Sequence, residues 1–136
     1  MLDKEQIRKV KRSYSRCFIG EKNLIDRFYD IFLVSHPDIP EMFKYTDFNQ
    51  QKLLLRQGIN CMIMYAEGVF AGDFCLEEIK VSHNRKHYNI NPSYYPYWKQ
   101  SLLKALKEYD PEFNSELEAL WSESLDKGIN FMTEGY

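Results

Sequence analysis

Long hydrophobic runs and blocks of like charge are both missing from this sequence. The longest uninterrupted apolar run covers residues 61–66, whereas a membrane-spanning helix needs about 20 apolar residues. The N-terminus does not combine a positive charge with an apolar stretch, so it does not resemble a secretory signal peptide. Lysine and arginine are interspersed with acidic residues, and the net charge is −2. We therefore expect a cytoplasmic protein that binds neither membranes nor nucleic acid.

Cysteine is scarce, with Cys17, Cys61 and Cys75 the three in the chain. Their number is odd and none lies in a Cys-x-x-Cys sequence, which argues against a disulfide framework and against a thiolate zinc site. We expect all three to be reduced, apolar residues that are buried or half-buried, as suits a reducing cytosol.

The sequence also lacks a glycine-rich phosphate loop, a His-Glu-x-x-His motif and a recognisable nucleophile–base pair. Few catalytic interpretations survive these absences, and the three histidines remain as the candidates for chemistry. His36 precedes Pro37 at the end of a predicted helix, where a surface cap is its expected role.

Apolar residues recur with helical spacing through almost the whole chain, and no segment alternates in the way of a half-buried strand. The sequence therefore predicts an all-α protein. Pro37 and Pro40 leave room only for a short helix ending near Phe43, and the stretch between Gly68 and Gly72 interrupts a longer one. Three residues are suited to cap helix N-termini: Asp3, Asp47 and Asn91, the last with Pro92 at the first helical position.

His83 and His87 are four residues apart, a spacing that can place two metal ligands on one helix face. Because Pro92 follows closely, the helix should end near His87, whereas His83 continues the apolar face of Leu76 and Ile79. The pattern thus predicts an inward His83. Such a histidine is more often a hydrogen-bonded core residue than a ligand, and both readings stay open at this point.

Two longer motifs resemble a known family. Residues 27–43 combine Phe-Tyr-x-x-Phe, then His-Pro, then a closing Phe. From His83 the sequence continues as His-x-x-x-x-Tyr-Asn-Ile-x-Pro-x-x-Tyr, followed by Trp98. Together they resemble bacterial single-domain globins and the haem domain of flavohaemoglobins, over nearly the whole chain. One departure is that the interval from His83 to Pro92 is two residues longer than in flavohaemoglobins.

The resemblance implies one globin domain over residues 1–136, with the three-over-three globin fold and a haem b cofactor. His83 would be the proximal iron ligand, and Tyr29 and Gln51 the distal residues that stabilise a bound gas. Gln50 is a rival to Gln51, which we prefer because Leu55 follows it on a more apolar stripe. The remaining pocket residues would be Phe43, Leu55, Ile79, Ile90, Tyr95 and Trp98.

Neighbouring groups follow from the same resemblance. The second ring nitrogen of a ligating histidine should donate its proton to a carbonyl or an acceptor side chain. The glutamate that fills this role in flavohaemoglobins has no clear counterpart, since Glu134 fits poorly by spacing. Candidates to pair with the haem propionates are Lys52, Arg56, Arg85 and Lys86.

The expected function is reversible binding of O₂, and of other diatomic gases such as NO and CO, with tight O₂ binding through Tyr29 and Gln51. Simple O₂ binding requires the fewest assumptions, and slow release would suit a reservoir or a sensor better than oxygen transport. One alternative is an NO dioxygenase that detoxifies NO with a separate reductase, since nothing here resembles a flavin or nicotinamide site. Another is a haem-free globin-like interaction or sensor module, and a third is a two-histidine metal enzyme.

Overall fold

A computed structural model of the chain describes residues 2–83 and 90–134, and every element in these residues is helical. This confirms the predicted all-α class. The elements are α1 (Lys4–Arg16), α2 (Leu24–Phe32), α3 (Asp38–Met42), α4 (Phe48–Glu67), α5 (Phe70–His83), the 3-10 turn η1 (Pro92–Tyr94), α6 (Tyr95–Tyr109) and α7 (Ser115–Thr133). No helix within these residues is both long and apolar enough to cross a membrane.

Side-chain caps fix where the helices begin. Asp3 and Gln6 form a reciprocal capping box at α1, and the Asp47 carboxylate accepts from the Asn49 N–H at α4, as predicted. The short helix α3 ends before Phe43, also as predicted. Asn91 caps the chain where expected, but Pro92 opens a 3-10 turn and α6 begins only at Tyr95.

The predicted interruption between the two glycines is shorter than expected. Gly68 ends α4 with a left-handed φ of 83°, which glycine adopts without strain. Gly72, however, lies within α5. A Cβ at Gly72 would lie 2.4 Å from the backbone nitrogen of Tyr65, so its glycine permits close packing of α5 on α4 and does not break the helix.

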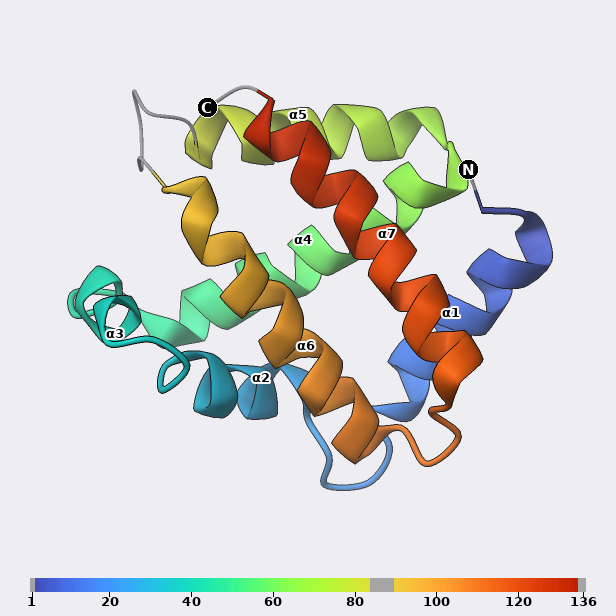
Figure 1. Cartoon of the computed structure of the whole chain (residues 1–136), viewed down its shortest axis with the longest axis horizontal. Helices are drawn as coiled ribbons and strands as arrows, with labels where there is room; N and C mark the ends of the chain where they lie inside the picture. The colour runs from blue at the N-terminus through green and yellow to red at the C-terminus, as the bar shows by residue number, and fades with distance from the viewer. Residues whose placement is uncertain (1, 84–89, 135–136) are drawn as a thin grey trace.

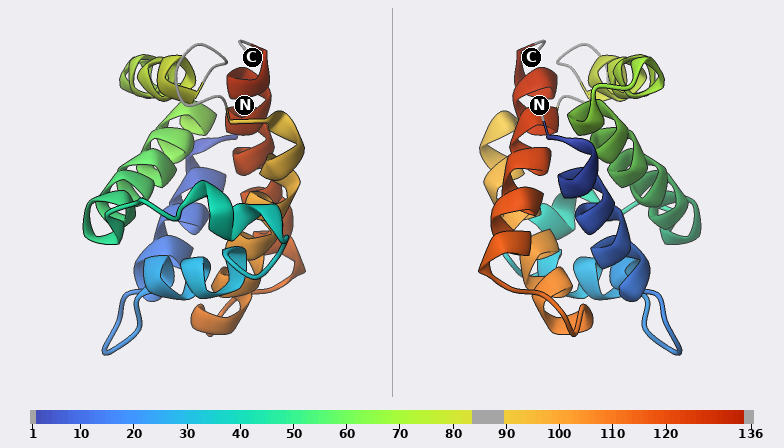
Figure 2. Two further views of the ribbon diagram at one scale, coloured as in Figure 1. Left: turned by 90° about the vertical axis from the view of Figure 1, so that its left-hand side faces the viewer. Right: turned by 90° about the vertical axis from the view of Figure 1, so that its right-hand side faces the viewer.

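The helices pack in two groups around a shared core. Figure 2 shows α6 and α7 on one side of the molecule and α4 and α5 on the other, and Figure 1 shows α6 and α7 crossing in front of α4. Packing contacts join α4 to α5 and α7, and α2 to α6. The largest buried side chains include Phe28, Leu102 and Trp121, contributed by α2, α6 and α7.

Cys61 of α4 and Cys75 of α5 form a disulfide, with their Cα atoms 5.7 Å apart. The expectation of three reduced cysteines was therefore wrong for this pair. Their sequence separation of 14 hides the contact, because two helices joined by a tight turn bring distant positions side by side. Cys17 is the buried free cysteine, as expected.

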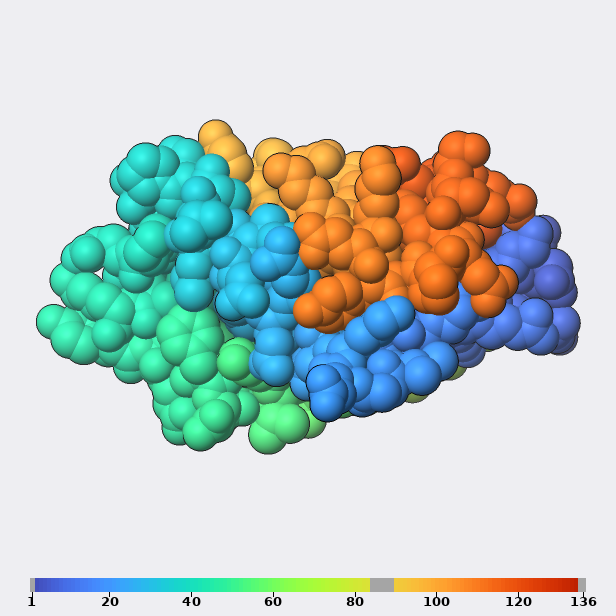
Figure 3. Space-filling view, turned by 90° about the horizontal axis from the view of Figure 1, so that it is seen from below, coloured from blue at the N-terminus to red at the C-terminus, as the bar shows by residue number. Residues whose placement is uncertain are grey.

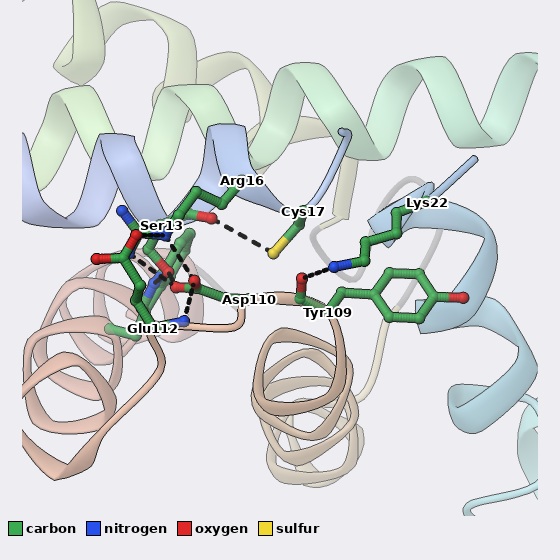
Figure 4. A network of polar contacts seen from close by, with 8 residues as sticks. Ser13, Arg16, Cys17, Lys22, Tyr109, Asp110 and Glu112 are labelled. Carbon is green, nitrogen blue, oxygen red and sulfur yellow. Dashed lines mark hydrogen bonds and ion pairs between the residues drawn. The ribbon is translucent and has the colours of Figure 1, made fainter. Parts of the chain in front are cut away.

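A buried carboxylate ties α1 to the link between α6 and α7 (Figure 4). Asp110 accepts from Ser13 Oγ at 2.6 Å and from Arg16 Nε at 2.6 Å, and the Glu112 N–H donates to it at 2.9 Å. Trp121 Nε1 donates in turn to Ser13 Oγ. Beside it Lys22 donates to the Tyr109 carbonyl, so the α1–α2 and α6–α7 links lie together at the end of the molecule seen in Figure 3.

We expect Asp110→Asn to destabilise the protein by about 2–3 kcal/mol, because it removes charge-assisted hydrogen bonds from a buried site. Burial opposes ionisation, but the hydrogen bonds from Arg16 and Ser13 outweigh it and hold the pKa of Asp110 below its ordinary 3.8. A depressed carboxyl pKa contributes stability that is present above pH 4 and is lost as the pH falls through the folded-state value. Urea unfolding between pH 7 and 2 should therefore show a shallower acid loss in Asp110→Asn than in wild type; parallel curves would contradict this account.

Candidate functional site

Tyr29 and Gln51 meet between α2 and α4. The Gln51 side-chain amide donates to the Tyr29 hydroxyl oxygen at 3.1 Å. Tyr29 is 4% exposed, and burial raises its pKa to about 12 despite the hydrogen bond from Gln51, so the phenol keeps its proton at neutral pH. A hydroxyl that already accepts a hydrogen bond is a better donor to a further acceptor.

Aromatic rings surround the Tyr29 phenol. Phe28 and Phe48 meet it edge-on at centroid distances of 5.0 and 5.4 Å, and Phe43 lies at 6.1 Å. Phe43 was predicted from the sequence as a pocket residue, whereas Phe48 was not. Its position was a usable signal, because Phe48 lies three residues before Gln51 and so shares its face of α4. The rings leave the Tyr29–Gln51 pair in apolar surroundings.

Leu55 and Gln50 differ in burial. Leu55 is buried one turn after Gln51, as the apolar stripe predicts. Gln50 is exposed, which favours Gln51 as the residue that faces Tyr29. The structure thus brings together Tyr29 of α2, Gln51 and the stripe of Leu55 on α4, and Phe43 at the end of α3.

His83 is the last residue of α5 and is half-buried. Its Nδ1 lies 2.9 Å from the Ile79 carbonyl oxygen and 3.0 Å from Ser82 Oγ. Burial lowers the pKa of His83, against the opposing effect of the bond to Ile79, so the ring is neutral at pH 7. With the proton on Nδ1 donated to the carbonyl, the lone pair is on Nε2, the form of imidazole that ligates metal ions.

Two hydrogen bonds, one from a side chain and one from the backbone, lie next to His83. The Ser82 hydroxyl donates to the Ile79 carbonyl at 2.8 Å, which adds a contact that the sequence analysis missed although Ser82 directly precedes His83. The Ile90 N–H donates to the His83 carbonyl at 3.1 Å, so Ile79, His83 and Ile90 are neighbours. Residues 84–89 lie outside the described part, and with them His87, Arg85 and Lys86.

Tyr95 and Trp98 are half-buried on the first turn of α6. The ring contact shown for Trp98 is with Phe28 of α2, at 5.9 Å. Trp98 therefore touches the aromatic group around Tyr29, and its predicted place on the His83 side stays a prediction, as does that of Tyr95.

Lys52 and Arg56, which were candidates to pair with the propionates, each contact a side chain of the protein. Lys52 Nζ pairs with Asp26 of α2 at 3.0 Å, and Arg56 stacks over the Phe18 ring at 4.2 Å. His36 acts as a cap, but at the start of α3: its Nδ1 accepts from the Asp38 N–H at 3.0 Å. Within residues 2–83 and 90–134 no three His, Cys, Asp or Glu side chains form a metal-binding group.

A solved structure is similar to this chain over nearly all its length. It is a Pseudomonas aeruginosa protein described as structurally highly homologous to a human hemoglobin. The two chains are 35% identical, the match covers 96% of this chain and 98% of the other, and the TM-score is 0.90. No protein-family model matches the sequence. A search of curated proteins found no match.

The burial of His83 gives a prediction for the protein without ligand. A histidine with a lowered folded-state pKa contributes stability that is present above its ordinary pKa of 6.5 and is lost as the pH falls through the folded value. Chemical unfolding from pH 8 to 5 should show this loss, with a slope of up to about 1.4 kcal/mol per pH unit. His83→Gln should lack this part of the slope, whereas His36→Gln should keep it; equal slopes in wild type and His83→Gln would refute the buried neutral imidazole.

Proposed function

The chain belongs to the globin family, and on that premise we propose that it forms a single globin domain that binds haem b through His83 and reversibly binds O₂. The observation that carries the proposal is the hydrogen bond of His83 Nδ1 to the Ile79 carbonyl. It fixes the tautomer in which Nε2 can hold iron. The relative's likeness to a human hemoglobin supports the same function.

The residues present suit a haem ligand set. A neutral imidazole is the ligand that haem iron accepts in globins, and it leaves the sixth coordination position for a diatomic gas. His83 would hold the iron, and the Ile79 carbonyl and the Ser82 hydroxyl would fix the plane of its ring. Leu55, Phe43, Ile79 and Ile90 would exclude water with their apolar side chains.

The Tyr29–Gln51 pair would supply polar recognition of the gas. Gln51 donates to the phenol oxygen, so the Tyr29 proton is available to an acceptor other than Gln51. Because Tyr29 lies among aromatic rings, such a hydrogen bond would form in low-dielectric surroundings. It would favour O₂ over CO, since CO is the poorer acceptor.

NO dioxygenation is the second candidate, because a tightly held O₂ is also the form that can react with NO. It would need a separate reductase to return the iron to the ferrous state. A haem-free globin-like interaction module would need neither the buried phenol of Tyr29 nor the metal-ligating form of His83. The two predictions below separate these functions.

The first prediction concerns the iron ligand. Purified protein mixed with haemin should show a Soret band and, after reduction, the spectrum of five-coordinate ferrous haem. His83→Ala should lose that spectrum, whereas His36→Ala and His87→Ala should keep it. If His87→Ala alone loses it, the assignment of His83 is wrong; a protein that retains no haem after excess haemin is removed by gel filtration would contradict haem binding and favour the interaction module.

The second prediction concerns the distal pair. Tyr29→Phe should release O₂ at least about tenfold faster, because a charge-assisted hydrogen bond is worth roughly 1.5–3 kcal/mol. CO release should change less. Stopped-flow measurement of both gases, with Gln50→Leu as an exposed control beside Gln51→Leu, checks this. Equal O₂ release from Tyr29→Phe and wild type would remove Tyr29 from gas recognition, and nitrate formation from NO with an added reductase would favour the dioxygenase.

A further inference from the structure

We propose that the Cys61–Cys75 disulfide is a reversible redox site, opened by a dithiol reductant, that controls how firmly α5 is held against α4. Its second part rests on the proposed function: because α5 ends in His83, opening the disulfide weakens retention of haem.

The disulfide joins the two helices that bear the candidate ligand residues. Cys61 lies on α4, ten residues after Gln51, and Cys75 lies on α5, eight residues before His83. At 1.5 Å per residue, the crosslink is about 12 Å along α5 from His83. Because His83 lies only about two helical turns from Cys75 on the same helix, a change in the packing of α5 on α4 would also move His83.

Helix α5 has few other buried contacts. Gly72 and Leu76 are its buried residues, whereas α4 buries six of its side chains. Phe70 and Phe74, which would anchor the helix if they faced the core, are 77% and 65% exposed. The crosslink is therefore one of the few buried side-chain anchors of α5, beside the packing of this helix on α4 and α7.

The N-terminal end of α5 is fixed independently of the disulfide. Only Gly68 and Val69 separate it from α4, and at Gly72 the two backbones are in close contact. Beyond Cys75 the helix is held by buried Leu76, by half-buried Ile79 packed against the core, and by Lys80, whose Nζ lies 4.3 Å over the Phe131 ring of α7. Opening the disulfide thus frees chiefly the C-terminal half of α5, which ends in His83.

The chemistry is thiol–disulfide exchange. Cys61 is 3% exposed and Cys75 is half-buried, so a thiolate of the reductant attacks the Cys75 sulfur and Cys61 leaves as a thiolate that takes up a proton. The second thiol of the reductant then displaces Cys75 and closes the reductant's own disulfide. Two electrons pass to the pair, and Cys61 and Cys75 each end as a thiol.

Cys17 stays out of this exchange. It is fully buried, its thiol donates to the Ser13 carbonyl, and burial raises its pKa to about 12. The reactive thiolate is therefore scarce at Cys17. Disulfides in a reducing compartment are typically transient or redox-sensing, which is the behaviour proposed for Cys61 and Cys75.

The test compares oxidised and reduced protein by hydrogen exchange and by haemin loss. Protein purified without reductant should contain a Cys61–Cys75 peptide crosslink by mass spectrometry, with one titratable thiol after unfolding. Dithiothreitol should then speed amide exchange in the second half of α5 at least about tenfold, since a crosslink closing 14 residues strongly restrains its loop. Exchange in α6 should be unchanged, whereas α7 packs on α5 and does not serve as a control.

Two variants provide the controls. Cys17→Ser keeps the pair and should respond to dithiothreitol as wild type does. Cys61→Ala/Cys75→Ala should match reduced wild type and be insensitive to dithiothreitol; if it does not fold, Cys17→Ser with and without reductant gives the same comparison. Transfer of haemin to an excess of an acceptor apoprotein should be at least about threefold faster from the reduced form.

Three titratable thiols in the unreduced protein, or α5 exchange indifferent to reduction, would overturn the redox site. Faster α5 exchange with unchanged haemin loss would overturn the link to His83. If no haemin binds while α5 still responds to dithiothreitol, the redox site stands and the proposed function fails. The two proposals are therefore separable.

Discussion

The close packing of α4 against its neighbours is the constraint on which the rest of the structure depends. At Gly72 the backbone of α5 touches that of α4, and at Gly128 of α7 a Cβ would lie 2.5 Å from Met62 of α4. With α4 fixed by these contacts, one of its faces directs Gln51 to Tyr29 and another directs Cys61 to Cys75. A single helix thus links the Tyr29–Gln51 pair to the position of α5.

The two candidate ligand groups are built differently, and each suits its proposed role. Tyr29 lies in a cluster of aromatic rings from three segments, which position the phenol. Gln51 is the polar partner shown for its hydroxyl. The His83 ring bonds to Ile79 and Ser82 of its own helix, and its backbone carbonyl accepts from the Ile90 N–H. The contacts shown for Tyr29 come mainly from other segments, whereas those shown for the His83 ring lie a turn or less away in sequence.

Much of the architecture was predictable because it is encoded locally. Asp3 and Asp47 cap helices since their carboxylates reach N–H groups two or three residues away. Apolar spacing likewise placed Leu55 and Leu76 on apolar helix faces, and both are buried. Gly72 was misread as part of a helix break because the sequence cannot show whether a glycine is needed for its backbone freedom or for its lack of a side chain.

The sequence by itself determined the all-α class, the starts of α1 and α4, and the inward direction of His83, because these follow from residues a few positions apart. Only the tertiary structure decided that Phe48 packs on Tyr29, that Lys52 and Arg56 face α2 and Phe18, and that Cys61 and Cys75 are joined. These contacts depend on the angles at which separate helices cross, and local spacing does not specify those angles.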